Sequence, residues 1–571
     1  MGERFTPRDR PDDVTSNGSG LISELRRREV LRVAAAYIVA GAVVAGAAND
    51  ILPNLGAPSW TVTLVIVVLL AGLPIALVLA WFFQVKPEGP PVSQLARDGS
   101  DGSRDGIAVL PFENLSPDPN DAYFSDGLTE EIIADLSVSR SLRVISRSSV
   151  MALKGTKKTV REIANELGVQ YVLEGSVRKA GDSLRITAQL IDAEADHHLW
   201  GEKYDGALDD IFSIQESVSR AIVDALRLTL TPLEEGRISR RPVADVRAYD
   251  LSMKARQRIY SFRKEEMEQA RRDLEEALGI AGENAYLFYL LAHLHYQFWN
   301  AGIRLVEEDL ARARTYADKA LLLDPRSPDY LVIRGLLEVT GGNAVTGYRY
   351  FEAALERDPH HADALFWSPG ISAFLGRDVE AKRRLEQLRR VDPLNPFASI
   401  FEVWTELKKA RFTAALELAR ELRKTINEPL LEGAYALALG QAGRPDEAVP
   451  VLGSAFGSEV DMIARVFRAF ARAFEGDRSG VLELMDADFE RWAGKDFQYS
   501  EFAAQALAKV GELDRAMDWL ETSVERGNIN HPFLSRGDTF LEDLRRRPRF
   551  EVLMERVKRE WESFEGRVEP M

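Results

Sequence analysis

The chain has 571 residues, and at about 150 residues per domain this length predicts three or four structural units rather than one core. Its net charge of −16, from 89 acidic and 73 basic residues, argues against a general nucleic-acid-binding role. The absence of cysteine excludes disulfide scaffolds, zinc ribbons, iron–sulfur clusters and thiol nucleophiles, although it assigns no redox compartment.

The N-terminal part combines a polar tail with two apolar runs. Residues 1–28 are polar and lack apolar periodicity, which predicts a disordered tail. Two uncharged runs follow, Val33–Ala48 and Val62–Phe83, and each approaches the roughly 20 residues that cross a hydrocarbon core. This pattern predicts a two-helix transmembrane hairpin over 29–84, with the lipid bilayer in contact with residues 30–83.

A cleaved signal peptide is the alternative for the first apolar run, because an Ala-rich segment ends there at Ala47 and Ala48. The run begins about 30 residues into the chain, later than is typical of a signal peptide, and a second apolar span follows almost at once. These two features favour the hairpin.

Basic residues around the two runs set the expected orientation. Four arginines precede the first run, from Arg26 to Arg32, and Lys86 follows the second, whereas the link between the runs carries none. We therefore expect a two-pass protein of the bacterial inner (cytoplasmic) membrane with both termini in the cytoplasm. No charged residue lies in the middle of either run, which predicts an anchor rather than a transporter.

A linker and a compact α/β domain are expected next. Residues 85–106 are rich in Pro, Gly and polar residues, which is typical of a flexible linker. Over 107–232, apolar strands and amphipathic helices follow in the order strand, helix, strand, helix, hairpin, helix. Thr159 and Glu162 have the spacing of a capping box, and Gly168 stands where a left-handed C-terminal cap belongs.

Several segments of this domain make it similar to the TolB N-terminal-like (FlgO-related) domain: IAVLPFENLS, FSDGLTEEI, LRVISRSS and REIANELGVQYVLEGSVRKAGDSLRITAQLIDAEADHHLW. The flanking RRREVLRVAAAYIVAG and FFQVKPEG resemble the membrane module found in that family. The resemblance implies an accessory unit between a membrane segment and tetratricopeptide repeats (TPRs), without a defined ligand or activity.

In that family the accessory unit stands behind class III adenylate cyclase domains, protein kinases or winged-helix domains. We expect none of these modules here, because only a short tail precedes the apolar runs. A cyclase name for this chain would then depend on the shared accessory regions and not on catalytic residues.

The rest of the chain is helical and repetitive. Asp-Pro pairs at 324–325, 358–359 and 392–393 are each 34 residues apart, which is the tetratricopeptide period. This period predicts roughly eight helix pairs, and thus an all-α TPR superhelix with a C-terminal capping helix over 245–565. Small residues near the same period mark the second helices of the expected pairs: Ala313, Gly347, Ala381, Ala415, Ala448 and Ala516, with Leu482 as an exception.

The concave groove of such a superhelix usually receives a peptide from a partner protein. Four aromatic residues are candidates for this groove: Tyr289, Tyr296, Phe298 and Trp299. The alternative is that they belong to the core, where aromatic residues at helical spacing are more often found.

A basic cluster in the α/β domain is a candidate contact for an anion or for lipid headgroups. It consists of Arg147, Lys154, Lys157 and Lys158. The alternative is a solvated loop.

No pattern points to catalysis. His293 and His295 are two residues apart on an expected helix and point to different sides, and the adjacent pairs His197–His198 and His360–His361 lack a third ligand. The sequence contains no GxSxG, HExxH, kinase or phosphate-loop signature. We therefore expect no catalytic residue, no metal and no cofactor.

Together these patterns predict a multi-domain protein with a transmembrane hairpin, a small α/β domain and a TPR superhelix. The expected function is that of a non-catalytic, membrane-tethered scaffold or regulatory protein that binds a protein or peptide partner, and not nucleic acid, through its groove. The alternative is a ligand-sensing signal-transduction module, in which the TolB-like domain binds a small molecule or nucleotide and modulates partner binding. The sequence leaves open the partner, the signal and whether the chain forms a homo-oligomer.

Overall fold

The computed structural model describes most of the chain after residue 105. The described ranges are 106–118, 121–238, 241–261, 263–301, 303–304, 306–457 and 462–565. All of them belong to one compact unit, Ala96–Met571. The predicted tail over 1–28, the predicted hairpin over 29–84 and all but the last residue of the predicted linker over 85–106 lie outside the described residues.

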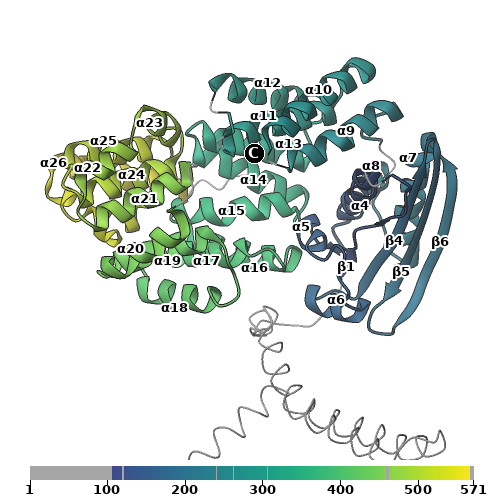
Figure 1. Cartoon of the computed structure of the whole chain (residues 1–571), viewed down its shortest axis with the longest axis horizontal. Coiled ribbons are helices and arrows are strands. Elements are labelled where there is room, and N and C mark those ends of the chain that lie inside the picture. Colours follow the sequence, from purple (N-terminus) through teal and green to yellow (C-terminus); the bar gives the residue numbers. More distant parts are fainter. Residues whose placement is uncertain are drawn as a thin grey trace, which may run out of the picture. The chain divides into compact units, whose positions relative to one another are not determined.

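A mixed β-sheet opens the described chain, with strands in the order β3-β1-β4-β5-β6 and with β2 paired to β4 (Figure 1). β1 runs parallel to β3 and β4, whereas β4, β5 and β6 form an antiparallel meander whose last strand the sequence did not predict. The strands are β1 (Gly106–Val109), β2 (Glu113–Asn114), β3 (Arg143–Val144), β4 (Tyr171–Ala180), β5 (Ser183–Asp192) and β6 (His197–Ala207).

Helices cover one face of this sheet, and at β1 and β4 they cover the other face as well. Leu184 and Ile186 of β5 are buried while Arg185 and Thr187, which alternate with them, are exposed, which is the pattern of a sheet with one apolar face. That apolar face shares one core with α4 (Ala122–Ser137) and α7 (Ile211–Ala225). The opposite face of β1 and β4 shares a second core with α5 (Arg147–Met151) and α6 (Val160–Leu167).

The predicted ends of α6 are confirmed. The Thr159 side chain accepts a hydrogen bond from the Glu162 amide, and the Glu162 carboxylate accepts one from the Thr159 amide at 2.7 Å. Gly168 follows the helix with φ 64°, a left-handed conformation that glycine adopts without a Cβ clash. Local spacing alone therefore predicted both boundaries.

A helical repeat region like that of TPR proteins follows the sheet and the short helix α8 (Pro232–Ile238), and its helices pack as successive pairs (Figure 1). The paired helices are α9 (Val246–Ile259) with α10 (Lys264–Ala281), α11 (Ala285–Asn300) with α12 (Glu307–Leu323), α13 (Pro328–Thr340) with α14 (Ala344–Arg357), α15 (Ala362–Phe374) with α16 (Asp378–Val391), α17 (Phe397–Lys408) with α18 (Phe412–Leu422), α19 (Pro429–Gln441) with α20 (Pro445–Phe456), α21 (Met462–Phe474) with α22 (Arg478–Leu484), and α24 (Phe497–Lys509) with α25 (Leu513–Glu525). The short helix α23 (Ala487–Ala493) precedes α24, and α26 (Pro548–Glu565) follows the last pair.

The 34-residue period corresponds to the packing of these pairs. Ala313, Ala381 and Ala415 are fully buried, because a small side chain lets the second helix of a pair approach the first closely. The three Asp-Pro pairs directly follow α12, α14 and α16. Proline cannot donate the amide that would continue a helix, so each pair ends its helix at the same point of the repeat.

The predicted membrane architecture requires correction. Within the described ranges, no helix is both long and apolar enough to cross a membrane. The longest helices there, α10 and α26, have 18 residues each and carry many charged side chains, and their apolar residues pack against neighbouring helices. The fold class is therefore a small sheet domain followed by a helical repeat region, and the prediction of a two-pass inner-membrane protein is wrong on this finding.

The close contact between β4 and its neighbours generates a stability prediction. A Cβ at Gly175 would overlap both the buried Phe112 ring and the Thr187 carbonyl, so Gly175→Ala should lower the free energy of unfolding by about 1–3 kcal/mol. Gly201→Ala is the matched control on β6, where the nearest atom to an added Cβ would be the Gln189 Cβ, at an ordinary contact distance of 3.5 Å. Urea unfolding followed by circular dichroism measures both, and equal midpoints for the two variants would contradict the prediction.

Candidate interaction surfaces

The four aromatic residues predicted for the groove all lie on α11. Tyr296, Phe298 and Trp299 are buried. Tyr289 is half-buried and packs against the rings of His293 and Tyr330, with centroid distances of 6.1 and 5.4 Å. The structure thus places these residues in the packing around α11, which is the alternative that the sequence left open.

The predicted basic cluster is divided among separate ion pairs. Arg147 pairs with Glu130 and lies over the Tyr260 ring at 4.8 Å. Lys154 pairs with Asp126 and Lys158 with Glu166, both at 2.5 Å. Lys157 is exposed. Since three of the four cations already contact different carboxylates, they do not converge on one anion site.

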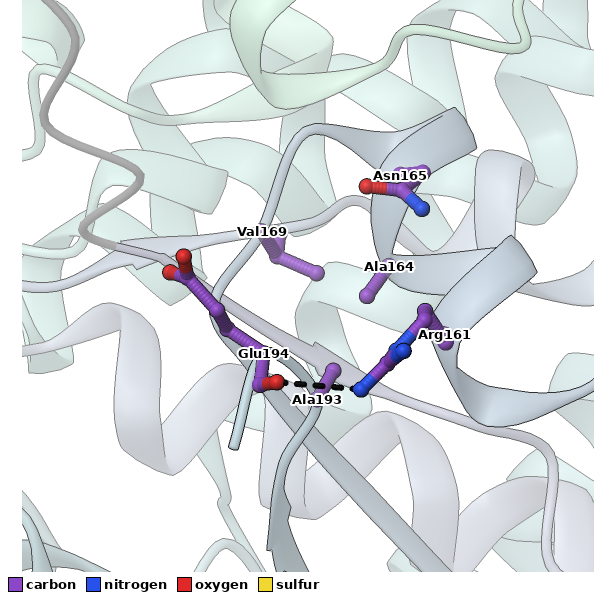
Figure 2. Close-up of a pocket in the computed structure, with 6 residues that line it drawn as sticks. All are labelled: Arg161, Ala164, Asn165, Val169, Ala193 and Glu194. Carbon is purple, nitrogen blue, oxygen red and sulfur yellow. Dashed lines mark hydrogen bonds between the residues drawn. The ribbon is translucent and has the colours of Figure 1, made fainter. Parts of the chain in front are cut away.

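A cavity of about 240 Å³ lies beside α6 in the sheet domain (Figure 2). Its lining residues are Arg161, Ala164, Asn165, Val169, Ala193 and Glu194. Arg161 supplies its cationic group, and one guanidinium nitrogen already donates to the Glu194 carbonyl at 3.1 Å. The cavity is therefore small, and part of its lining is polar.

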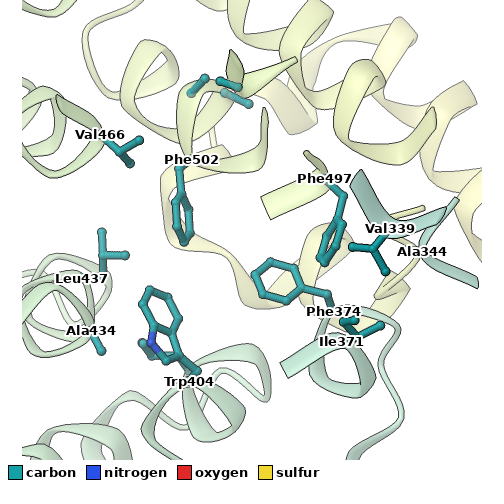
Figure 3. Packing of buried hydrophobic residues seen from close by; sticks show 14 of the residues in the cluster. Val339, Ala344, Ile371, Phe374, Trp404, Ala434, Leu437, Val466, Phe497 and Phe502 are labelled. Carbon is teal, nitrogen blue, oxygen red and sulfur yellow. The ribbon is translucent and has the colours of Figure 1, made fainter. Parts of the chain in front are cut away.

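The first helices of successive repeat pairs present a surface on which α24 lies. Phe374 of α15, Trp404 of α17, Leu437 of α19 and Val466 of α21 define this inner surface (Figure 3). Phe497 of α24 meets Phe374 edge-on at 4.9 Å, and Phe502 of α24 lies 5.6 Å from Trp404. The last repeat pair thus packs against the inner surface of earlier pairs.

A segment after α25 continues along the same surface, and we call residues 526–547 the C-terminal strap. It contains only short helical turns at Phe533–Gly537, Thr539–Leu541 and Leu544–Arg546, and the predicted capping helix follows it as α26, which begins at Pro548. Proline at the first position starts a helix readily because its missing amide would be unpaired there.

The strap crosses the ends of the first helices one after another. Arg526 donates to the carbonyl of Gly341, directly after α13, at 3.4 Å. Asn530 donates to the carbonyls of Ala373 in α15 and Lys408 in α17, at 2.8 and 3.3 Å. Thr539 donates to the Gln441 carbonyl of α19 at 3.1 Å, and the Phe540 ring lies 5.7 Å from Phe474 of α21. The final carbonyls of a helix lack partners within it, so a crossing segment can satisfy them.

A buried polar network fastens α24 and the strap to the inner surface. Lys408, 4% exposed, contacts Glu501 of α24, 0% exposed, at 2.5 Å. Gln505 donates to both Glu501 and Asp538, at 2.8 and 2.7 Å, and Gln441 donates to Asp538 at 2.8 Å. Burial lowers the pKa of Lys408 and raises the pKa of Glu501. The ion pair compensates for part of the cost of burying both charges.

A second polar contact joins the sheet domain to the repeats. The Asp392 carboxylate, from the third Asp-Pro pair, accepts hydrogen bonds from the hydroxyls of Ser146, Ser148 and Ser149, the last two at 2.6 Å. Ser149 in turn accepts from the Leu394 amide at 3.0 Å, and the Ser146 amide donates to the Val391 carbonyl at 2.8 Å. The turn after α16 is therefore held by the segment that joins β3 to α5.

Sequence reasoning missed both of these contacts. The LRVISRSS segment predicted a strand, and the Asp-Pro period predicted a turn, but neither indicated that the two would meet. Lys408, Glu501 and Gln505 are buried polar residues, and the sequence by itself does not distinguish them from the other polar residues of α17 and α24. Buried polar groups require partners, so their burial, which only the structure shows, indicates an additional contact from elsewhere in the chain.

Comparisons with known proteins match parts of this chain. Residues 103–221 match the family described as HilA/YgeH-like transcriptional regulator, second domain. A protein of Rhizobium meliloti (strain 1021) named "Putative adenylate cyclase 3" is 43% identical over 230 residues, which is 40% of this chain and 39% of that protein. "Transcriptional regulator HilA" of Salmonella typhimurium (strain LT2) is 20% identical over 353 residues, 60% of this chain and 61% of that protein. The chain thus matches less than two thirds of the length of each relative.

A solved tetratricopeptide repeat protein from Parabacteroides merdae ATCC 43184 is similar to 49% of this chain over 100% of its own length, with 16% identity and a TM-score of 0.34. The helical repeat assignment rests on the paired helices and their period rather than on this distant likeness. None of these matches is to a TolB N-terminal-like protein.

The contact at Asp392 generates the second prediction. Asp392→Ala removes the acceptor of three hydroxyls, and the buried Ser146 and Ser149 hydroxyls lose their partner, at a cost of about 1–3 kcal/mol. Amide hydrogen exchange across 146–151 should become faster. Asp324→Ala is the matched control, because the Asp324 carboxylate accepts from the Arg326 amide of its own turn at 3.2 Å. Unchanged exchange across 146–151 in Asp392→Ala would contradict this role.

The first residue before α24 generates a pH prediction. Burial raises the pKa of Asp496 to about 6, against the opposing effect of the Tyr499 and Gln498 amides that donate to it. The folded chain therefore binds this proton more tightly than the unfolded chain, and the contribution of Asp496 to stability rises as pH falls through 6. Between pH 7.5 and 5, the wild type should gain about 1 kcal/mol of unfolding free energy relative to Asp496→Asn, which keeps a capping side chain.

Asp477→Asn, at the start of α22, is the control for this pH effect. The Gly480 amide lowers the pKa of Asp477, so its contribution is lost, not gained, as the pH becomes acidic. Urea unfolding of the wild type and of both variants at pH 7.5 and 5 measures the two contributions. If the wild type gains the same unfolding free energy relative to Asp477→Asn as relative to Asp496→Asn, Asp496 is not the source of the gain.

Proposed function

We propose that the chain is a non-catalytic protein-interaction scaffold or regulatory protein, whose TPR-like inner surface binds a short segment of a partner protein. The observation that carries this proposal is the strap. Across the ends of α13, α15, α17, α19 and α21, backbone carbonyls and buried side chains already hold a segment made of short helical turns. A surface that satisfies the polar groups of one short segment has the chemistry needed to bind another.

A signalling context agrees with this proposal. The relatives that match parts of the chain are named as an adenylate cyclase and a transcriptional regulator, and the match to each is partial. Partial matches to differently named proteins are more consistent with an accessory role than with the activity of either. We propose that the sheet domain, which resembles TolB N-terminal-like domains in sequence, serves in this accessory role.

The alternative function is a ligand-sensing module, and one observation favours it. The cavity beside α6 lies in the same sheet domain whose serines hold Asp392, so a small molecule bound there would have a physical route to the repeats. A ligand effect on partner binding that persists in Asp392→Ala would argue against this route.

A displayed library of random 15-residue peptides tests the scaffold proposal on the full chain. We expect enriched peptides with apolar side chains and at least one carboxamide or carboxylate group. Their binding should weaken about tenfold in Gln441→Ala, which removes a donor from the inner surface, because a hydrogen bond to a charged group is worth roughly that much. Val379→Ala is the control, since Val379 is 78% exposed on α16. Enriched peptides that bind both variants equally would contradict binding at the inner surface.

A further inference from the structure

We infer that the C-terminal strap is an internal ligand of the inner surface, and that a partner binds there by displacing it. The partner segment that fits is apolar and forms short helical turns, with a carboxamide and a carboxylate spaced as Asn530 and Asp538 are. This inference rests on the proposed function and adds to it the chemistry of the partner and the regulation of the site.

The strap's side chains define what the inner surface recognises. Asn530 uses its carboxamide to donate to two helix-end carbonyls, and Asp538 uses its carboxylate to accept from Gln441 and Gln505. Apolar side chains bury themselves on either side of Asp538: Phe533, Leu534, Phe540 and Leu541. The polar positions select a register and the apolar positions supply the burial, which is how bound peptide segments are usually recognised.

The strap is an imperfect ligand for the surface it covers. The buried carboxamide oxygen of Asn528 has no hydrogen-bond partner within the described ranges, although its nitrogen donates to Glu501 at 2.7 Å. A buried acceptor without a partner makes the bound strap less stable than a fully satisfied segment would be. A partner that places no unsatisfied polar group at this position therefore has an advantage over the strap.

The strap's own hydrogen bonds are confined to short helical turns, such as those from the Leu534 amide to the Asn530 carbonyl at 3.0 Å and from the Asp538 amide to the Phe533 carbonyl at 2.8 Å. The burial of its apolar side chains depends on the neighbouring helices α15, α17, α19, α21 and α24. Segments of this kind open locally at a lower free energy than the helices around them. Displacement then requires release of the strap and not unfolding of the repeats.

A fluorescent synthetic peptide of residues 526–547 tests the inference in trans. The full chain with Asp538→Ala has a strap that lacks its carboxylate anchor, while the inner surface is unchanged, so we expect it to bind the wild-type peptide at least about tenfold more tightly than the wild-type chain does. Asp543→Ala is the matched control, because Asp543 lies on the same strap but is exposed. A peptide that itself carries Asp538→Ala should lose this gain.

Two results would overturn the inference. The first is a folded Asp538→Ala chain, verified by circular dichroism, that binds the peptide no better than wild type and Asp543→Ala do. The second covers the case in which Asp538→Ala does not fold: in the wild-type chain, amides of the strap exchange hydrogen no faster than those of α17 and α24.

The outcomes also separate this inference from the proposed function. One outcome is that the strap peptide binds in trans to the Asp538→Ala chain while the random library yields no binder on the wild-type chain or on Asp538→Ala. This result would support displacement of the strap and overturn the scaffold proposal. A chain that dimerises in light scattering, and loses the dimer when the peptide is added, would assign the surface to a second copy and overturn displacement by a separate partner.

Discussion

The Lys408 ammonium is buried among aromatic rings, and the C-terminal half of the repeat region is arranged around that constraint. Phe374 and Phe533 place their ring centroids 4.0 and 4.6 Å from its nitrogen. An isolated charge would be very costly in such a position, so Glu501 of α24 must remain beside it. Glu501 is itself buried, and through Gln505 it is connected to Asp538 of the strap. One buried cation therefore sets the positions of α17, α24 and the strap together.

The apolar packing follows the same arrangement. Phe497 and Phe502 on α24 stand on either side of Glu501 in sequence and contact Phe374 and Trp404 (Figure 3). The hydrophobic contacts supply most of the attraction, because they remove large aromatic surfaces from water. The polar network supplies the register, since a shift of α24 by one turn would leave buried charges without partners.

The contact between the sheet domain and the repeats likewise depends on a buried charged group whose partners come from a distant segment of the chain. Asp392 is buried, and its two oxygens are satisfied by serine hydroxyls and by Asn395 of its own turn. The three serine hydroxyls of the segment that precedes and begins α5 therefore fix the position of the turn after α16 against that segment. A proposed regulatory role for the sheet domain depends on this contact, because it ties a repeat turn to the core that contains the cavity.

The amino-acid sequence by itself determined the features that depend on neighbouring residues. The capping box at Thr159, the left-handed Gly168 and the helix ends at the Asp-Pro pairs follow from local backbone chemistry, and the 34-residue period follows from the packing of adjacent helices. Only the tertiary structure decided which distant segments meet: Asp392 with Ser149, and Asp538 with Gln441. Those contacts join residues 97 and 243 positions apart in the sequence, so the periodicity of neighbouring residues could not predict them. The two apolar runs over 29–84 led to a membrane prediction from composition alone, while the described helices use their apolar residues to pack against one another. Periodicity specifies a helix and its neighbours, whereas the burial of a polar side chain specifies a partner that only the folded chain brings into contact.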